Sequence, residues 1–295
     1  MPSAQRINTI ASHLVADLRE TVRREYDEQS VEKYDNITTQ GWRDMELFTF
    51  DKAVKVASRG LAEDASRDLR ILDLACGNGR ATRLLAAYSG AGSVIGVDFS
   101  QTMVDDANRI EAEASTGKST YDVRDIFNLG IVAGGNFDVI NVTFGLHYAA
   151  SEQMLLKCLK DSRRNLKQGG AFVLIGGHPD RFMNMSSPKF LNANYALVGF
   201  KMKFPQGWPP KPFDSVVYEI FADGVDTMDG KAEPEYRLTC SFVPIGTYER
   251  LFLAAGFSRV ERIHWTYAGR DEGDTNPYLE RVLSIEPHMC MVAWR

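Results

Sequence analysis

Short apolar runs alternate with longer amphipathic segments through the middle of the chain. The runs are rich in Val, Ile and Leu and are typical of buried strands. We expect strands at 70–74, 93–97, 120–123, 137–142 and 171–175. The segments between them carry apolar residues at helical spacing, and we expect helices at 79–88, 101–115 and 151–166. This alternation predicts a mostly parallel sheet with helices on both faces.

Two amphipathic stretches precede the alternation. The first lies within residues 1 to about 40 and has apolar side chains at helical spacing, namely Leu14, Leu18, Val22 and Tyr26. The second is a helix expected at 44–62, with one apolar face made by Leu47, Phe50, Val54 and Ala57. We expect this second helix to cover one side of the sheet.

After Gly176 the alternation stops for about 60 residues, which are rich in proline and aromatic residues. Four prolines between Pro205 and Pro212 preclude long helices there. Such an insert suits a hydrophobic or aromatic small molecule; alternatively, it packs a small core of its own. Further elements are expected at 237–242 (strand), 246–255 (helix), 258–265 (strand) and 288–294 (closing strand).

Composition excludes some classes of function. The net charge is −5, whereas a nucleic-acid partner favours a basic stripe. No apolar run is long enough for a membrane span, and the N-terminus lacks a signal-peptide profile. The four cysteines fit no metal-ligand spacing, so we expect no metal and reduced thiols. These features predict a cytoplasmic protein, either monomer or homodimer, without nucleic-acid or membrane partners.

The most informative stretch is Leu69 to Ala81, LRILDLACGNGRA. An apolar run ends in a carboxylate, Asp73, and a turn of small residues follows before a helix begins. Glycine accepts a positive φ at low cost and lets a ligand lie against the backbone. A second apolar run ends in Asp98, about 20 residues after the glycines, where nucleotide-binding units place an acid that binds ribose hydroxyls. The spacing Ala75-x-Gly77-x-Gly79 is not the dinucleotide pattern, which argues against a nicotinamide-dependent oxidoreductase.

This order of acids and small residues resembles the core of class I S-adenosylmethionine (SAM) dependent methyltransferases. The step LKQGGAFVLI, at 166–175, is also similar to that family. In the family the first glycine of the turn is usual, and Ala75 stands there instead. The resemblance implies a Rossmann-like seven-stranded sheet with an antiparallel last strand and an aromatic-rich lid inserted after strand five.

The resemblance also divides the chain into four parts and assigns cofactor contacts. The parts are a helical lid or cover (1–62), a SAM-binding core (63–177), an acceptor-binding lid (178–240) and the rest of the sheet (241–295). The implied cofactor-binding residues are Tyr34, Asp73, Ala75, Gly77, Asn78, Gly79, Asp98, Phe99, Met103, Asp125, Ile126 and Thr143. Asp98 would bind the ribose, Asp125 and Ile126 the adenine, Thr143 and Phe144 the methionine end, and Tyr34 the methionine carboxylate. Met103 as a core residue, Asp125 as a loop residue and Tyr34 as a packing residue stay open.

Candidates for a base or positioning group are His147, Tyr26 and His178. The ordinary pKa of histidine would let His147 act as a base near neutrality. His178 follows strand five and could reach the same cleft. Each of the three could instead be structural.

The predicted reaction is transfer of a methyl group from SAM to an O or N atom of a small hydrophobic or aromatic acceptor, with S-adenosylhomocysteine as product. An alternative is a methyltransferase fold that uses SAM structurally in a cyclisation. A binding subunit that only keeps the fold is a further alternative.

Overall fold

The computed structural model describes residues 20–22, 25–26, 40–59, 61, 68–88, 90–114, 117–183, 185–195, 200–221 and 233–295. Its centre is a seven-stranded sheet. The strands lie in the order β3 (Ser119–Val123), β2 (Ala91–Asp98), β1 (Leu69–Leu74), β4 (Phe137–Thr143), β5 (Leu166–Gly177), β10 (His288–Trp294) and β9 (Arg259–Ile263).

The first five strands in this order run parallel to one another, whereas β10 pairs antiparallel with both β5 and β9. The order changes direction between β1 and β4, because β2 and β3 lie on one side of β1 whereas β4 and β5, which come next in the chain, lie on its other side. In open α/β sheets a ligand binds at such a switch point, outside the carboxyl ends of the strands. The predicted fold class, with its antiparallel last strand, is confirmed.

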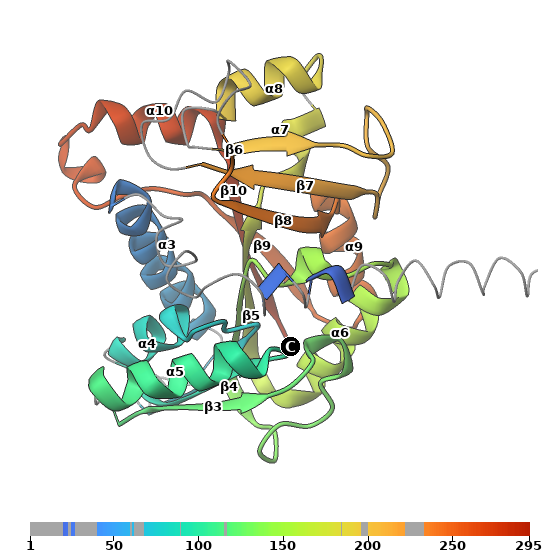
Figure 1. The fold of residues 1–295 in the computed structure, drawn as a ribbon. Helices are drawn as coiled ribbons and strands as arrows, with labels where there is room; N and C mark the ends of the chain where they lie inside the picture. The colour runs from blue at the N-terminus through green and yellow to red at the C-terminus, as the bar shows by residue number, and fades with distance from the viewer. Residues whose placement is uncertain are drawn as a thin grey trace, which may run out of the picture.

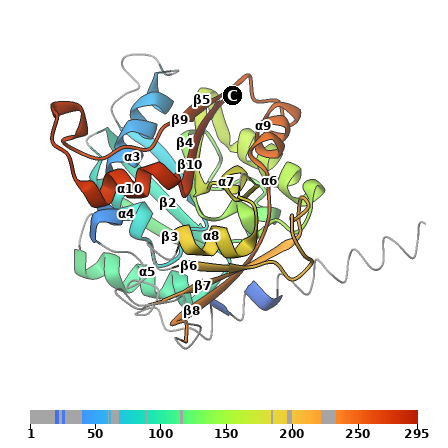
Figure 2. The same cartoon turned by 90° about the horizontal axis from the view of Figure 1, so that it is seen from above.

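Helices cover both faces of the sheet (Figures 1 and 2). One face carries α3 (Gln40–Ser58) and α4 (Arg80–Ala87), and the other carries α6 (Glu152–Asn165) and α9 (Ile245–Ala254). A further helix, α5 (Gln101–Ala114), packs on β2 and β3. Apolar side chains from these helices and from both faces of the sheet form two large buried clusters, which hold the strand ends in fixed positions.

The helix α3 covers the sheet as predicted, but one residue of its expected apolar face is exposed. Phe50, Val54 and Ala57 are buried, whereas Leu47 is 42% exposed. The buried positions in that turn are Met45, in the apolar cluster of the insert, and Glu46, which pairs with Arg80. Tertiary neighbours therefore rotate the buried stripe at this end of the helix.

The insert after β5 folds over one end of the main sheet (Figure 1). It contains α7 (Pro179–Met183), α8 (Pro188–Tyr195) and a three-stranded antiparallel sheet of β6 (Phe200–Lys203), β7 (Ser215–Ile220) and β8 (Tyr236–Ser241). The strand expected at 237–242 is β8, but β6 and β7 were not predicted. The insert has its own apolar cluster, including Leu191, Met202 and Val216, so packing that core is one of its roles.

The helix α10 (Pro277–Ile285) was also not predicted. Its signal is present in the sequence: the Asn276 side chain caps the helix by accepting from the N–H groups of Tyr278 and Leu279, and Pro277 occupies the first turn. Among the described helices, none is both long enough and apolar enough to cross a membrane.

Candidate functional site

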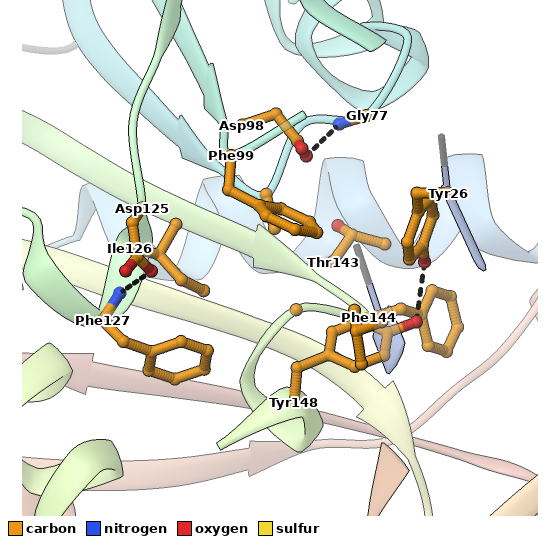
Figure 3. A pocket seen from close by; sticks show the side chains of 13 residues that line it. Tyr26, Gly77, Asp98, Phe99, Asp125, Ile126, Phe127, Thr143, Phe144 and Tyr148 are labelled. Atoms are coloured by element: carbon orange, nitrogen blue, oxygen red, sulfur yellow. Dashed lines mark hydrogen bonds between the residues drawn. The ribbon is translucent and has the colours of Figure 1, made fainter. Parts of the chain in front are cut away.

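A pocket opens where β1, β2 and β4 end, and it contains about 660 Å³ of empty space, part of it open to solvent. Figure 3 shows its side chains. The sequence-predicted residues that line it are Tyr26, Ala75, Gly77, Asp98, Phe99, Asp125, Ile126 and Thr143. We call this cavity the cofactor pocket. It lies at the switch point of the sheet, where the fold predicts a ligand.

The turn after β1 forms one wall of the cofactor pocket. Ala75 and Gly77 both have a φ of 54°, in the left-handed region, and Gly79 has a φ of 82°. Glycine accepts this conformation at low cost at position 77, and the Gly77 N–H donates to the Asp98 carboxylate over 2.9 Å. Gly79 has a different reason to be glycine: a Cβ there would lie 2.6 Å from the Tyr121 hydroxyl oxygen. Tyr121 therefore covers Gly79, which is not part of the pocket lining.

The Asp98 side chain connects the end of β2 to the turn after β1. One carboxylate oxygen accepts the Gly77 N–H and the other accepts the Ser100 N–H, 3.0 Å away. The residue is 5% exposed and still lines the pocket. Because backbone donors hold both oxygens, the carboxylate is fixed in orientation toward the pocket (Figure 3).

A second carboxylate lies across the pocket. Asp125 caps the short helix Ile126–Asn128 by accepting the Phe127 N–H over 3.0 Å. Ile126 and Phe127 add apolar surface beside it. The pocket therefore combines two acidic acceptors with an aromatic and aliphatic lining, which suits a nucleoside with a flat base and polar sugar.

Asp73 is structural in its contacts. It is 1% exposed, and its carboxylate accepts from Thr82 Oγ1 at 2.6 Å and from Asn141 Nδ2 at 2.7 Å. Burial raises the pKa of Asp73 to about 6, although both hydrogen bonds oppose the rise. Asp73 thus braces β1, α4 and β4 beneath the turn and does not line the cofactor pocket.

The phenol groups of Tyr26 and Tyr148 meet at the edge of the pocket. Their oxygens are 2.6 Å apart, and the Tyr26 ring also packs edge-on against Phe99 with centroids 6.3 Å apart. The carboxylate of the preceding residue, Glu25, accepts from the Thr239 N–H and hydroxyl on β8. This part of the N-terminal segment therefore contacts both the core and the insert.

The two candidate histidines do not line the cofactor pocket. His147 lies on the loop after β4 and faces a separate cavity against β7 and β8. Burial lowers its pKa to about 4, so it is neutral at pH 7 but a weaker base than its sequence predicts. His178 lines a third cavity beside Trp265 and His288, because its backbone N–H is tied to Pro287 at the start of β10. His178, which was expected to reach the same cleft, therefore lines a different cavity from the cofactor pocket.

Four more of the predicted cofactor residues have other positions or lie outside the described residues. Met103 is fully buried in the core, which matches its open alternative. Asn78 is 1% exposed within the turn and, like Gly79, is absent from the pocket lining. Tyr34 lies outside the residues that the structure describes.

The structure adds Val22, Phe127, Gly145 and Tyr148 to the pocket, none of them among the predicted cofactor contacts, and it includes Phe144, which was expected beside the methionine end. Phe144 and Tyr148 belong to the loop after β4, where the switch-point rule itself was a usable signal. Val22 gave no comparable signal, because its contact with the pocket depends on residues distant in the chain.

Comparison with known families agrees with this geometry. Residues 71–170 match a family model described as a methyltransferase domain. That stretch runs from β1 into β5 and includes the turn, Asp98 and Asp125. This part of the chain is therefore similar to a methyltransferase domain.

The relatives of this methyltransferase domain include the demethylmenaquinone methyltransferase of Leptospira interrogans. It is 32% identical over 116 residues, which are 39% of this chain and 45% of that protein. The match thus spans less than half of the relative.

Two solved structures share the fold. The CcbJ methyltransferase of Streptomyces caelestis has a TM-score of 0.60 and 16% identity, with 92% of this chain and 97% of that chain covered. A SAM-dependent methyltransferase from Clostridium acetobutylicum has a TM-score of 0.52 and 16% identity, with 83% and 90% covered. At such identities the likeness concerns the fold alone.

Proposed function

We propose that this protein binds SAM in the cofactor pocket and transfers its methyl group to an O or N atom of a small hydrophobic or aromatic molecule. The observation that carries the proposal is the Asp98 carboxylate, held by Gly77 and Ser100 at the pocket wall within a methyltransferase domain.

The residues of the pocket fit the proposed cofactor. A carboxylate can accept about four hydrogen bonds, and Asp98 lines the pocket, so it is a fitting acceptor for ribose hydroxyls. We assign to Asp125 the role of accepting from an adenine amino group, with Ile126 and Phe127 along the base, because all three line the pocket. Two carboxylates also give the pocket a negative potential, which favours a ligand with a sulfonium and an amino group.

The chemistry that SAM supplies when bound is an activated methyl group, whose bond to sulfur breaks as the acceptor lone pair bonds to its carbon, leaving neutral S-adenosylhomocysteine. The protein then has to align the acceptor and exclude water. We assign the acceptor side to the loop 143–148 and the insert 178–240. His147 is the proposed proton acceptor, and Tyr26 a positioning group at the pocket edge.

The substitution Asp98→Ala tests the site. Isothermal titration calorimetry with SAM should show at least a ~30-fold weaker dissociation constant, because the ribose loses its acceptor in a buried setting. Asp122→Ala is the matched control, since this aspartate lies on the neighbouring strand β3 with a side chain that is 52% exposed. A folded Asp98→Ala protein that binds SAM as tightly as wild type would overturn the assignment.

A further inference from the structure

The cavity that contains His178 is large and has no assigned ligand. It contains about 1150 Å³ of empty space, part of it open to solvent, and leaves about 500 Å³ in which the centre of a water molecule can lie. Binding sites for small molecules are usually clefts of roughly 300–1,000 Å³. We call this space the β10 cavity, because the first residues of β10, namely His288, Met289 and Cys290, line it.

The β10 cavity lies where the chain leaves the sheet after β9 and returns to it at β10. β9 ends at Ile263, and an excursion over residues 264–287, which contains α10, leads back to β10 (Figure 1). Trp265 and Leu283 line the cavity from this excursion, whereas His178 lines it from just beyond the end of β5. Because β10 pairs with both β5 and β9, the sheet holds these walls together.

The β10 cavity is separate from the cofactor pocket. Among the described residues, the two share none in their linings. They come nearest to each other at two rings: Phe144 lines the cofactor pocket, His288 lines the β10 cavity, and their centroids are 4.8 Å apart. A molecule in the β10 cavity is therefore screened from a methyl group in the cofactor pocket, so its ligand is neither the cofactor nor the methyl acceptor.

Flat rings and apolar side chains make up the inner wall. The rings of Trp265 and His288 have centroids 4.9 Å apart and planes tilted by 48°. Burial lowers the pKa of His288 to about 3 and also lowers that of His178, so both imidazoles are uncharged at pH 7. Leu283 and Met289 add aliphatic surface. This wall suits an aromatic ligand, because flat rings pack well in offset or edge-on contacts.

The charged side chains of the lining are half-exposed, and one of them has unused donors. The two lining acids, Glu280 and Glu286, are already paired with arginines. Arg262 donates through Nε to the Glu249 carboxylate over 2.7 Å, and its two terminal NH₂ groups have no hydrogen bond to any described residue. Two such groups form a planar fork that matches the two oxygens of a carboxylate.

We propose that the β10 cavity binds a small aromatic carboxylate. The ring system packs against Trp265, His288 and Leu283, and the carboxylate accepts from the terminal NH₂ groups of Arg262. An uncharged ring would make the same apolar contacts and leave these donors unused. The inference goes beyond the proposed function and does not depend on it.

The test measures binding of 2-naphthoate and 2-naphthamide to the whole chain by calorimetry, with and without saturating S-adenosylhomocysteine. The probes share both rings and differ in the charge of one substituent. We expect 2-naphthoate to bind at least about 10-fold more tightly than the amide, because only the carboxylate gains charge-assisted hydrogen bonds. Arg262→Gln should weaken 2-naphthoate binding at least about 10-fold and leave 2-naphthamide binding unchanged.

Arg259→Gln is the matched control. Arg259 lies on the same strand, pairs with Glu261 and packs over the Trp294 ring, and it does not line the β10 cavity. This variant should bind both probes like wild type. Ser284→Trp is a second test: it adds a large ring at an exposed position of α10 that lines the cavity, and it should weaken both probes. Urea denaturation of each variant confirms that it is folded.

Four results would overturn the inference: no binding of 2-naphthoate, equally tight binding of the amide, wild-type binding of 2-naphthoate by folded Arg262→Gln or Ser284→Trp, or displacement of 2-naphthoate by S-adenosylhomocysteine. The last result would place the probe in the cofactor pocket. Failure of the wild-type chain to bind S-adenosylhomocysteine contradicts the proposed function alone, because the probe and variant comparisons decide the β10 cavity without it.

Discussion

Two residues at the strand ends beside the cofactor pocket adopt backbone conformations that are unfavourable for their type. Ala75 and Phe144 have φ values of 54° and 55°, in the left-handed region. This conformation costs roughly 1–2 kcal/mol for a residue with a Cβ. Such outliers concentrate at ligand sites, where the surrounding structure imposes them. At Ala75 the cost explains why glycine is usual at that position of the turn.

Gly145 makes this arrangement possible. A Cβ on Gly145 would lie 2.8 Å from the Ala75 Cβ and 2.7 Å from Val142 Cγ2. We therefore expect Gly145→Ala to lower the free energy of unfolding by about 1–3 kcal/mol and to weaken SAM binding, measured by urea denaturation and calorimetry. Gly246→Ala is the control, because nothing lies within 4 Å of its added Cβ. Equal stability of the two variants would contradict the crowding argument.

Asp73 should make stability depend on pH. Folding raises the pKa of this carboxyl from 3.8 to about 6, so the protonated form is favoured in the folded state. The protonated Asp73 carboxyl therefore contributes to the stability of the folded protein at low pH, below its unfolded pKa of 3.8, and this contribution is lost as the pH rises through 6. Relative to Asp73→Asn, wild type should lose about 2 kcal/mol of unfolding free energy between pH 4 and pH 7. Urea denaturation at both pH values measures the difference, and an unchanged difference would show that Asp73 does not titrate in this range.

Among the elements, the described part of the N-terminal segment is joined to the rest by few but specific contacts. Tyr26 bonds to Tyr148, and Glu25 bonds to Thr239 on β8, residues that are 122 and 214 positions away in the chain. Neither contact follows from the helical periodicity of this segment. The contacts suggest that the segment's position depends on the core and the insert together.

Tyr148→Phe removes the phenol pair and keeps the ring. We expect it to destabilise the docked segment by about 1 kcal/mol, the net worth of a partly buried hydrogen bond. Hydrogen exchange should then be faster at the amides of residues 20–26. Tyr278→Phe is the matched control, because Tyr278 is 41% exposed on α10. Unchanged exchange in Tyr148→Phe would mean that the phenol pair does not hold the segment in place.

At the scale of the whole molecule, the last strand completes the sheet. β10 lies between β5 and β9 and pairs with both over most of its length. It also brings His288 against Phe144 at the loop after β4, with ring centroids 4.8 Å apart. The chain's end therefore contributes to the neighbourhood of the cofactor pocket.

A charge in the centre of β10 should therefore unfold the domain. Met291 is fully buried and faces the α6 and α9 side, so Met291→Asp is expected to cost more than about 4 kcal/mol. Circular dichroism and size exclusion would report the loss of the folded form. Leu253→Asp, at a position that is 55% exposed, should remain folded. A folded Met291→Asp protein would show that β10 is dispensable to the sheet.

The sequence by itself determined the parallel core, the turn after β1 and the placement of Asp98 and Asp125 at strand ends. These features depend on runs of adjacent residues, whose hydrophobic period and turn chemistry are local properties. Only the tertiary structure decided that Asp73 is buried beneath the turn, that His147 and His178 face other cavities, and that β6 and β7 build a second sheet. Burial and side-chain direction are set by partners distant in the chain, and the pattern of neighbouring residues carries no record of them.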